Sequence, residues 1–237
     1  MRPLLVLATA TAACTPHAVT PGARTFVMDS PLAPEVGHHD AQIDIAGIGQ
    51  LWGPELVNGN ARLRRTVSPG VVLEGEAGIL HVTNAGTGGD RNGYTGRVGV
   101  LLQSEDRRAA LAIGAGGGTS LVAGSWGSAD IGGMLTGKHA WIRPVLAADI
   151  GYSAPFGDQT FTVAEEDGTQ TTLRLPRNII AKVSLGLELG DRAASMLIGV
   201  SMVRFYLSES SVVDSVAEDY EDDGYLAAGL GIRFALD

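Results

Sequence analysis

Residues 178–207 read NIIAKVSLGLELGDRAASMLIGVSMVRFYL, and this stretch predicts two strands joined by a tight turn. In the first strand every second position is apolar: Ile179, Ala181, Val183, Leu185, Leu187 and Leu189. The positions between them carry Lys182 and Glu188 together with glycine, serine and one isoleucine. A period of two is the signature of a strand with one apolar and one polar face. The stretch therefore predicts a one-sided sheet, but it leaves open whether the apolar face meets a protein core or lipid.

The same rhythm continues along most of the chain from about residue 41. Strands are predicted at 41–52, 60–68, 71–83, 93–104, 108–118, 128–136, 140–154, 178–190, 194–207 and 224–236. The 33 glycines and the many valines, leucines, isoleucines and threonines favour strands joined by turns. No run of about 20 apolar residues is present, so no transmembrane helix is expected. The predicted fold class is all-β.

The predicted connections alternate between short and long. The short ones are 104–108, 136–139 and 190–192, and the long polar ones are 84–92, 119–127, 155–177 and 208–223. An up-and-down antiparallel transmembrane β-barrel has this asymmetry, because its periplasmic turns are short and its outer loops are long. Eight to ten strands are expected, since 41–52 and 60–68 are the weakest strand predictions. Pro144 cannot donate to a ladder, so a bulge is expected around it.

Charged residues fall on the polar faces of the predicted strands. They are Glu74, Glu76, Arg97, Arg143, Asp149, Lys182, Glu188 and Arg233, four acids and four bases. A balanced set on one side of a closed sheet predicts a network of ion pairs in a narrow lumen filled by side chains. The apolar rows would then face lipid, and the tryptophans and tyrosines near strand ends would form an interfacial girdle. The alternative for these aromatic residues is simple capping of a core.

The first residues have the layout of an export signal. Residues 1–14, MRPLLVLATATAAC, carry Arg2 before a short apolar stretch. Thr11–Cys14 resembles the bacterial lipobox, which implies lipidation of Cys14, and ordinary cleavage after an alanine is the alternative. This single cysteine excludes a disulfide framework. Residues 15–40 hold four prolines and no periodicity, so they are expected to form a flexible N-terminal arm ahead of a barrel at 41–237.

The last predicted strand resembles the C-terminal assembly signal of outer-membrane barrels. Gly231, Phe234 and Leu236 match the glycine and the alternating hydrophobic positions of that signal, whereas Gly229 and Asp237 depart from it. Together with the export signal, this strand makes the chain resemble the small OmpA-like outer-membrane β-barrel group. The resemblance implies a place in the cell outer membrane of a Gram-negative bacterium, contact with lipid and lipopolysaccharide, and insertion by the barrel assembly machinery.

Motifs for catalysis, metals or cofactors are weak in this sequence. His38, His39 and Asp40 are adjacent, and neighbouring side chains of an extended chain point apart, so no metal site is predicted. Residues 114–119 are glycine-rich, but neither a helix nor a P-loop lysine follows, so a strand end or loop is expected. The acidic run 214–223 lacks EF-hand spacing and predicts a solvated outer loop, with weak divalent binding as the alternative. A net charge of −9 argues against a nucleic-acid partner.

Three functions follow from these observations. The expected one is an outer-membrane barrel with a structural or interaction role, which presents the loops 155–177 and 208–223 and needs no cofactor. The second is a lipid-anchored soluble β-barrel whose apolar rows point inward and bind a small apolar ligand. The third is an outer-membrane lipid hydrolase that uses His81, although no serine lies at a suitable spacing from it. The sequence therefore predicts a protein that is not an enzyme.

Overall fold

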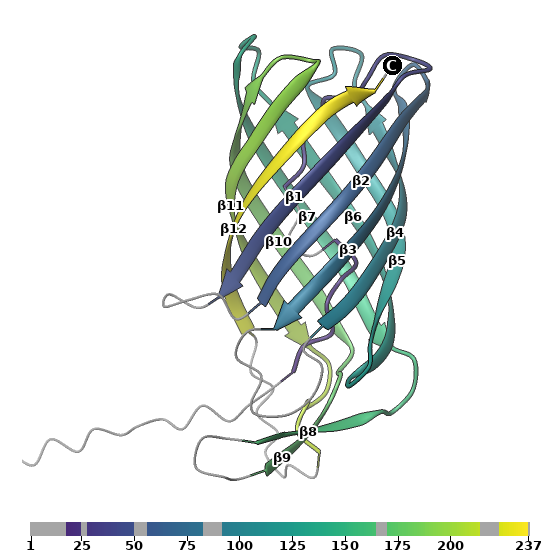
Figure 1. The fold of residues 1–237 in the computed structure, drawn as a ribbon, viewed down its shortest axis with the longest axis vertical. Helices are drawn as coiled ribbons and strands as arrows, with labels where there is room; N and C mark the ends of the chain where they lie inside the picture. The colour runs from purple at the N-terminus through teal and green to yellow at the C-terminus, as the bar shows by residue number, and fades with distance from the viewer. Residues whose placement is uncertain are drawn as a thin grey trace, which may run out of the picture.

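The computed structural model describes residues 18–24, 28–49, 56–82, 92–164, 170–213 and 223–236. Within this part of the chain, ten strands close into one antiparallel barrel (Figure 1). They are β1 (His39–Gly49), β2 (Leu56–Ser68), β3 (Val71–Val82), β4 (Asn92–Gln103), β5 (Ala109–Ser120), β6 (Gly124–Thr136), β7 (Ile142–Pro155), β10 (Asn178–Gly190), β11 (Ala194–Leu207) and β12 (Asp223–Leu236). A separate two-stranded hairpin consists of β8 (Thr160–Ala164) and β9 (Gln170–Arg174). The prediction of an all-β, up-and-down barrel is confirmed, with ten strands.

Each barrel strand pairs with its neighbours in the chain, and β12 closes the barrel by pairing with β1. A closed sheet has no free edge, so every strand finds backbone partners on both sides. One end of the barrel carries the short connections and the C-terminus, and is called the turn end here (Figure 1). The other end, called the loop end, carries the long connections, the β8–β9 hairpin and the short turn between β5 and β6. Within the described residues, no helix is long and apolar enough to cross a membrane.

The connection predicted at 119–127 is shorter than expected, and the glycine-rich stretch before it is strand. β5 continues to Ser120 and β6 begins at Gly124, so a tight turn joins them. Gly124 has a φ of +84°, a conformation that glycine adopts without strain. On the inner face, a Cβ at Gly118 would collide with the ring of Trp126. Glycine has a low intrinsic preference for strands, and here the packing of a large neighbouring ring overrides that preference.

The bulge expected at Pro144 is absent from the described pairing. β7 pairs with β10 in a continuous register through Leu187↔Pro144. On the other side, the ladder between β6 and β7 ends with Thr136↔Val145. Pro144 lies just beyond this ladder, so its missing N–H removes no ladder hydrogen bond. Its carbonyl accepts a hydrogen bond from the backbone N–H of Gly137 at 3.0 Å. The expectation was wrong because proline sits where one ladder has already ended.

Side chains alternate between the outside and the lumen along every barrel strand. The apolar row of β10 points outward, and Leu185 is 59% exposed. The other face of β10 points into the lumen, where Lys182 is 4% exposed. The same division holds around the barrel, where Val98 and Ile43 are also outward and exposed. The apolar rows therefore form the outer wall, and they do not meet in a common core.

The lumen contains apolar side chains as well as charged ones. At the loop end, two apolar clusters surround Phe205 and Trp126 and include Val19 and Ala18 from the segment before β1. At the turn end, a third cluster surrounds Leu101 on the β3–β7 side. The predicted aromatic girdle is therefore only partly correct, because Trp126 and Tyr225 lie inside the barrel. Among the described tryptophans and tyrosines, the outward ones are Tyr94, Trp141, Tyr152 and Tyr206, and Trp52 lies outside the described residues.

Candidate functional site: the plugged lumen

The segment before β1 runs through the lumen from one end to the other (Figure 1). Its described residues, 18–24 and 28–38, are called the arm here. At the loop end the N–H of Ala18 donates to the hydroxyl of Ser211 at 3.0 Å. At the turn end the N–H of Gly37 donates to the carbonyl of Thr66 at 2.8 Å. The sequence predicted a flexible arm, whereas the described part of it is a plug that the barrel wall surrounds.

Polar side chains of the wall bind the backbone of the arm. An extended segment without a neighbouring strand needs such partners, because a buried backbone group without a hydrogen bond is costly. Arg64 donates to the carbonyls of Ser30 and Leu32 at 3.1 and 2.9 Å. Further donors to arm carbonyls are Gln42 to Met28 at 3.1 Å, Thr66 to Pro34 at 2.9 Å, Ser153 to Pro21 at 2.8 Å and Arg233 to Leu32 at 2.8 Å. The lumen is thus lined as a binding channel for one extended peptide segment.

Two charged residues of the arm complete a network in the middle of the lumen. Arg24 donates to Glu74 at 2.7 Å and to Glu76 at 2.8 Å. Asp29 accepts from Arg62 at 2.6 Å and lies 3.1 Å from Arg24. The central cluster comprises Arg24, Asp29, Arg62, Glu74, Glu76, Arg97 and Asp130. Each arm charge meets carboxylates or guanidinium groups of opposite sign on the wall, which is the condition for burying ions at tolerable cost.

A second charged group lies nearer the turn end. Glu188 is fully buried and accepts hydrogen bonds from Ser30 at 2.6 Å and from Ser195 at 2.8 Å. Its carboxylate also pairs with Arg233 and, at 3.4 Å, with Arg143. The arm therefore supplies one of the hydroxyl groups that satisfy this buried carboxylate.

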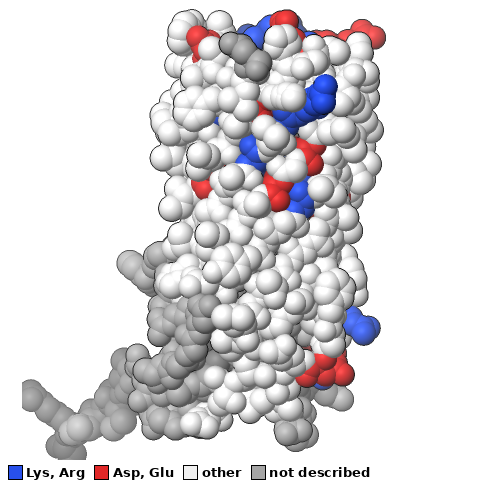
Figure 2. All heavy atoms as spheres, turned by 45° about the vertical axis from the view of Figure 1, so that its right-hand side comes forward, with Lys and Arg blue, Asp and Glu red and all other residues white. Residues whose placement is uncertain are grey.

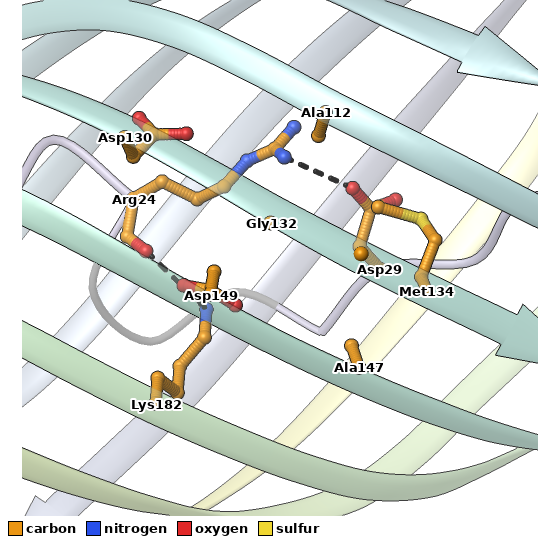
Figure 3. Close-up of a pocket in the computed structure, with 10 residues that line it drawn as sticks. Arg24, Asp29, Ala112, Asp130, Gly132, Met134, Ala147, Asp149 and Lys182 are labelled. Carbon is orange, nitrogen blue, oxygen red and sulfur yellow. Dashed lines mark hydrogen bonds and ion pairs between the residues drawn. The ribbon is translucent and has the colours of Figure 1, made fainter.

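A third pair joins β10 to β7. Lys182 lies 3.2 Å from Asp149 and donates to the carbonyl of Arg24 at 3.4 Å. Figure 3 shows this pair beside Arg24 and Asp29 of the arm, around a small cavity. The cavity volume is about 10 Å³, which is the room that one water molecule needs. A pocket for a small molecule has roughly 300–1,000 Å³, so this cavity does not act as a ligand site.

A recess in the wall holds the side chain of Met28. The inner face carries three glycines side by side, because Gly186 pairs with Gly199 and Gly199 pairs with Gly229. A Cβ at Gly186 or Gly199 would collide with the methyl group of Met28, and one at Gly229 would lie 3.5 Å from its Cγ. Met28 is 3% exposed in this recess. The glycines therefore provide the space through which the arm passes.

The eight charged residues predicted for the lumen all point into it. Asp149 is the most accessible of them, with a side chain that is 23% exposed, and the other seven are buried. Sequence reasoning missed Asp40, Arg62, Arg64 and Asp130 on the wall and Arg24 and Asp29 on the arm. The alternation of Arg62 and Arg64 with Leu63 was a usable signal in a strand predicted only weakly. The arm offered no such signal because it has no periodicity.

The remaining candidate residues fall into three groups. Gly231, Phe234 and Leu236 lie in β12 at the closing seam with β1, and their part in assembly stays a prediction. His81 is exposed and lies 2.9 Å from the amide oxygen of Asn92. Asp40 pairs with Arg64 at 2.8 Å, and in the described part of the chain no three metal-binding side chains converge. Cys14 and the acidic residues 214–222 lie outside the described residues.

The distribution of charged and uncharged side chains on the outer wall indicates whether water or lipid surrounds the barrel. The wall is mostly uncharged, with charged groups gathered near the two ends and in one area of the turn-end half (Figure 2). A closed sheet with an apolar outside and a polar inside is the organisation of transmembrane β-barrels. The chain has the architecture of an outer-membrane β-barrel. This architecture agrees with the place in the cell outer membrane that the sequence resemblance implied.

Comparisons with known proteins add solved structures but no family. No protein-family model matches the chain, and no curated protein matches it. The N-terminal barrel domain of Pseudomonas aeruginosa OprF aligns with 83% of this chain and 97% of its own, at 10% identity and a TM-score of 0.36. Neisserial surface protein A aligns with 83% of this chain and 95% of its own, at 11% identity and a TM-score of 0.37. A bacterial polysaccharide outer-membrane secretin aligns with 83% of this chain and 98% of its own, at 8% identity and a TM-score of 0.32.

Proposed function

We propose that this barrel is a closed structural or interaction protein of the outer membrane, and not a pore or an enzyme. The observation that carries the proposal is the lumen, which is occupied along its length by the arm and by ion pairs. A barrel of this size is filled by side chains, and here a segment of the chain itself adds to that filling. In the proposed orientation the turn end faces the periplasm and the loop end faces outward.

The loop end provides a surface for such a role. β9 binds the segment at 211–213 through Arg174 N–H to Ser211 O at 2.8 Å and Val213 N–H to Thr172 O at 3.0 Å. Leu173 and Val212 form an isolated bridge in the same place. The two longest connections, predicted at 155–177 and 208–223, are thereby joined beyond the barrel wall. Joined loops keep a fixed shape, which supports a role in presenting a surface to a partner outside the cell.

The remaining parts of the proposal come from the sequence. They are an export signal at 1–14, lipidation of Cys14, contact with lipid and lipopolysaccharide, and insertion by the barrel assembly machinery. The acidic residues 214–223 would lie near lipopolysaccharide phosphates, where divalent ions can bridge them.

A soluble barrel that binds an apolar ligand fits the side chains less well. It needs the apolar rows inside, and here they form the outer wall. An enzyme that uses His81 finds no support among the described contacts of that side chain, which involve Asn92.

The test combines extraction with electrical measurement. In cells that carry Cys14→Ser, we expect the protein to stay in the outer membrane and to migrate faster in detergent gels before heating than after heating. In planar bilayers, we expect the purified full chain to show no sustained open-channel current. Release of the Cys14→Ser protein as a soluble species would contradict the membrane barrel, and a stable ohmic current would contradict the closed lumen.

A further inference from the structure

The direction of the arm through the barrel is fixed by β1. His39 opens β1 at the turn end, opposite Leu236, the last residue of β12. Gly37, with a φ of +88°, lies in the turn at the end of the arm, directly before β1. The arm then runs against β1 and reaches the loop end, where Thr20 exchanges two hydrogen bonds with Asn178 at 3.0 and 3.1 Å. The amino-terminal side of the arm is therefore at the opposite end of the barrel from the C-terminus.

Where the arm reaches the loop end, hydrogen bonds and apolar packing hold it to the barrel. Thr20 is fully buried, and its hydroxyl donates to the carbonyl of Pro176 at 2.5 Å. Ala18 and Val19 pack on the two apolar clusters that close this end of the lumen. Ala18 also binds Ser211, which belongs to the connection between β11 and β12. The arm is thus held by the same connections that form the surface of the loop end.

Buried charge keeps the arm in place. If Arg24 and Asp29 left the lumen, Glu74, Glu76 and Arg62 would lose partners at 2.6–2.8 Å. Glu74 and Glu76 would keep Arg97 as a partner, but two buried carboxylates would then share fewer cations, so withdrawal of the arm toward the turn end is opposed. Met28 in its glycine recess adds a shape constraint at the same level of the barrel.

We propose that the arm carries the chain through the barrel, so that Ala18, its first described residue, lies at the end of the lumen that opens on the cell surface. This inference rests on the proposed orientation, with the loop end outward.

The experiment places one short epitope at three positions of the full chain. The first is inserted between Pro16 and His17, the second between Glu218 and Asp219 in the outer connection, and the third between Glu105 and Asp106 in a short turn. Antibody binding is measured on intact cells and on permeabilised cells. Heat-modifiable migration of each tagged protein shows that its barrel has folded.

The three positions separate the inference from the orientation on which it rests. We expect the first and second epitopes to bind antibody equally on intact and permeabilised cells, and the third to bind only after permeabilisation. If the second epitope is accessible on intact cells but the first is not, the threaded arm is refuted and the orientation stands. If the third is accessible and the second is not, the barrel is inverted and both proposals fail.

Discussion

At the scale of single residues, arginine organises the lumen. The guanidinium of Arg97 lies 2.8 Å from Glu74, 3.1 Å from Glu76 and 2.6 Å from Asp130. A planar guanidinium has five N–H donors, so one side chain can satisfy several carboxylates at once. Lysine carries a single compact charge, and the ammonium group of Lys182 lies 3.2 Å from the carboxylate of Asp149. We therefore expect a lumen arginine such as Arg97 to contribute more to the stability of the barrel than Lys182 does.

Arg97→Met should destabilise the barrel strongly. It leaves Glu74, Glu76 and Asp130 short of a buried partner, and breaking a buried pair costs about 3–5 kcal/mol. The matched control is Arg108→Met, which removes an exposed pair with Asp106 at 3.3 Å and should cost about 0–1 kcal/mol. The free energy of unfolding in lipid vesicles, measured with urea, checks both values.

Lys182→Met should fall between these two variants. Its partner Asp149 is partly accessible, so water screens part of the unpaired charge. We still expect Lys182→Met to lower the melting temperature in detergent more than any single acid substitution in 208–223. Equal melting temperatures would count against the role assigned to the lumen charges.

A turn carboxylate should give the barrel a small acid dependence. Asp191 accepts hydrogen bonds from the N–H groups of Ala193 and Ala194 at 2.9 and 3.0 Å. These bonds, that of Ala194 first, lower the pKa of the Asp191 carboxyl below its ordinary value. A lowered pKa adds stability above the unfolded value of about 3.9, and this stability is lost as the pH falls through the folded value.

The variant Asp191→Asn isolates that effect. The difference in unfolding free energy between the wild type and Asp191→Asn should be constant near neutral pH and should shrink as the pH falls below about 4. Unfolding curves at a series of pH values measure it. A difference that grows toward acid would show that the carboxylate does not cap this turn.

At the scale of elements, the arm is stabilised by side chains and not by a ladder. Strands of the wall satisfy each other through backbone pairing, whereas the arm binds wall side chains such as Arg64 and Gln42. The rest of its stability comes from Met28 and from the two charges of the central cluster. The position of the arm in the lumen therefore depends on a few residues that complement the wall. Reversing the charges of these residues should displace the whole arm.

The double variant Arg24→Glu with Asp29→Arg tests this dependence. Each new charge would face wall residues of its own sign, so we expect the arm to leave the lumen. Proteinase K should then trim the amino-terminal segment of the folded barrel in detergent, and mass spectrometry of the product measures the cut. The control is Glu35→Lys on the same arm, whose pair with Arg192 is largely exposed. If the double variant and the wild type resist proteinase K equally, the charges of Arg24 and Asp29 do not hold the arm in the lumen.

At the scale of the whole molecule, the barrel is apolar outside and charged inside. A soluble protein has the reverse arrangement, because its ions remain hydrated at the surface. Here the lipid phase takes the place of a protein core for the outward rows, and the lumen shields the ions from that phase. The outward face should therefore respond to substitutions as a lipid contact does.

Leu185→Arg measures this response. Leu185 is outward in the middle of β10, and an arginine on the lipid face near the bilayer midplane costs about 2–4 kcal/mol. Leu121→Arg is the control, because Leu121 is exposed in the tight turn between β5 and β6 and the substitution should be almost neutral. Both are measured as unfolding free energies in lipid vesicles. Equal and small effects would favour an outer wall in contact with water.

The sequence alone determined which side chains of the barrel strands face outward and which face the lumen. A period of two is a local property, so residues such as Leu185 and Lys182 reveal their opposite faces without any knowledge of the fold. Charge balance on the polar faces and the alternation of short and long connections then indicated a closed sheet and the side on which ions gather.

Only the tertiary structure decided what fills the lumen. The arm has no periodicity, and its contacts, such as Arg24 with Glu74, join residues far apart in the chain. Gly118 and Gly199 lie in strands that the sequence predicted, but nothing in the local sequence showed that they make room for Trp126 and Met28. Contacts of this kind depend on the three-dimensional closure of the barrel, because the space that a glycine leaves empty has meaning only once the residue that fills it is in place.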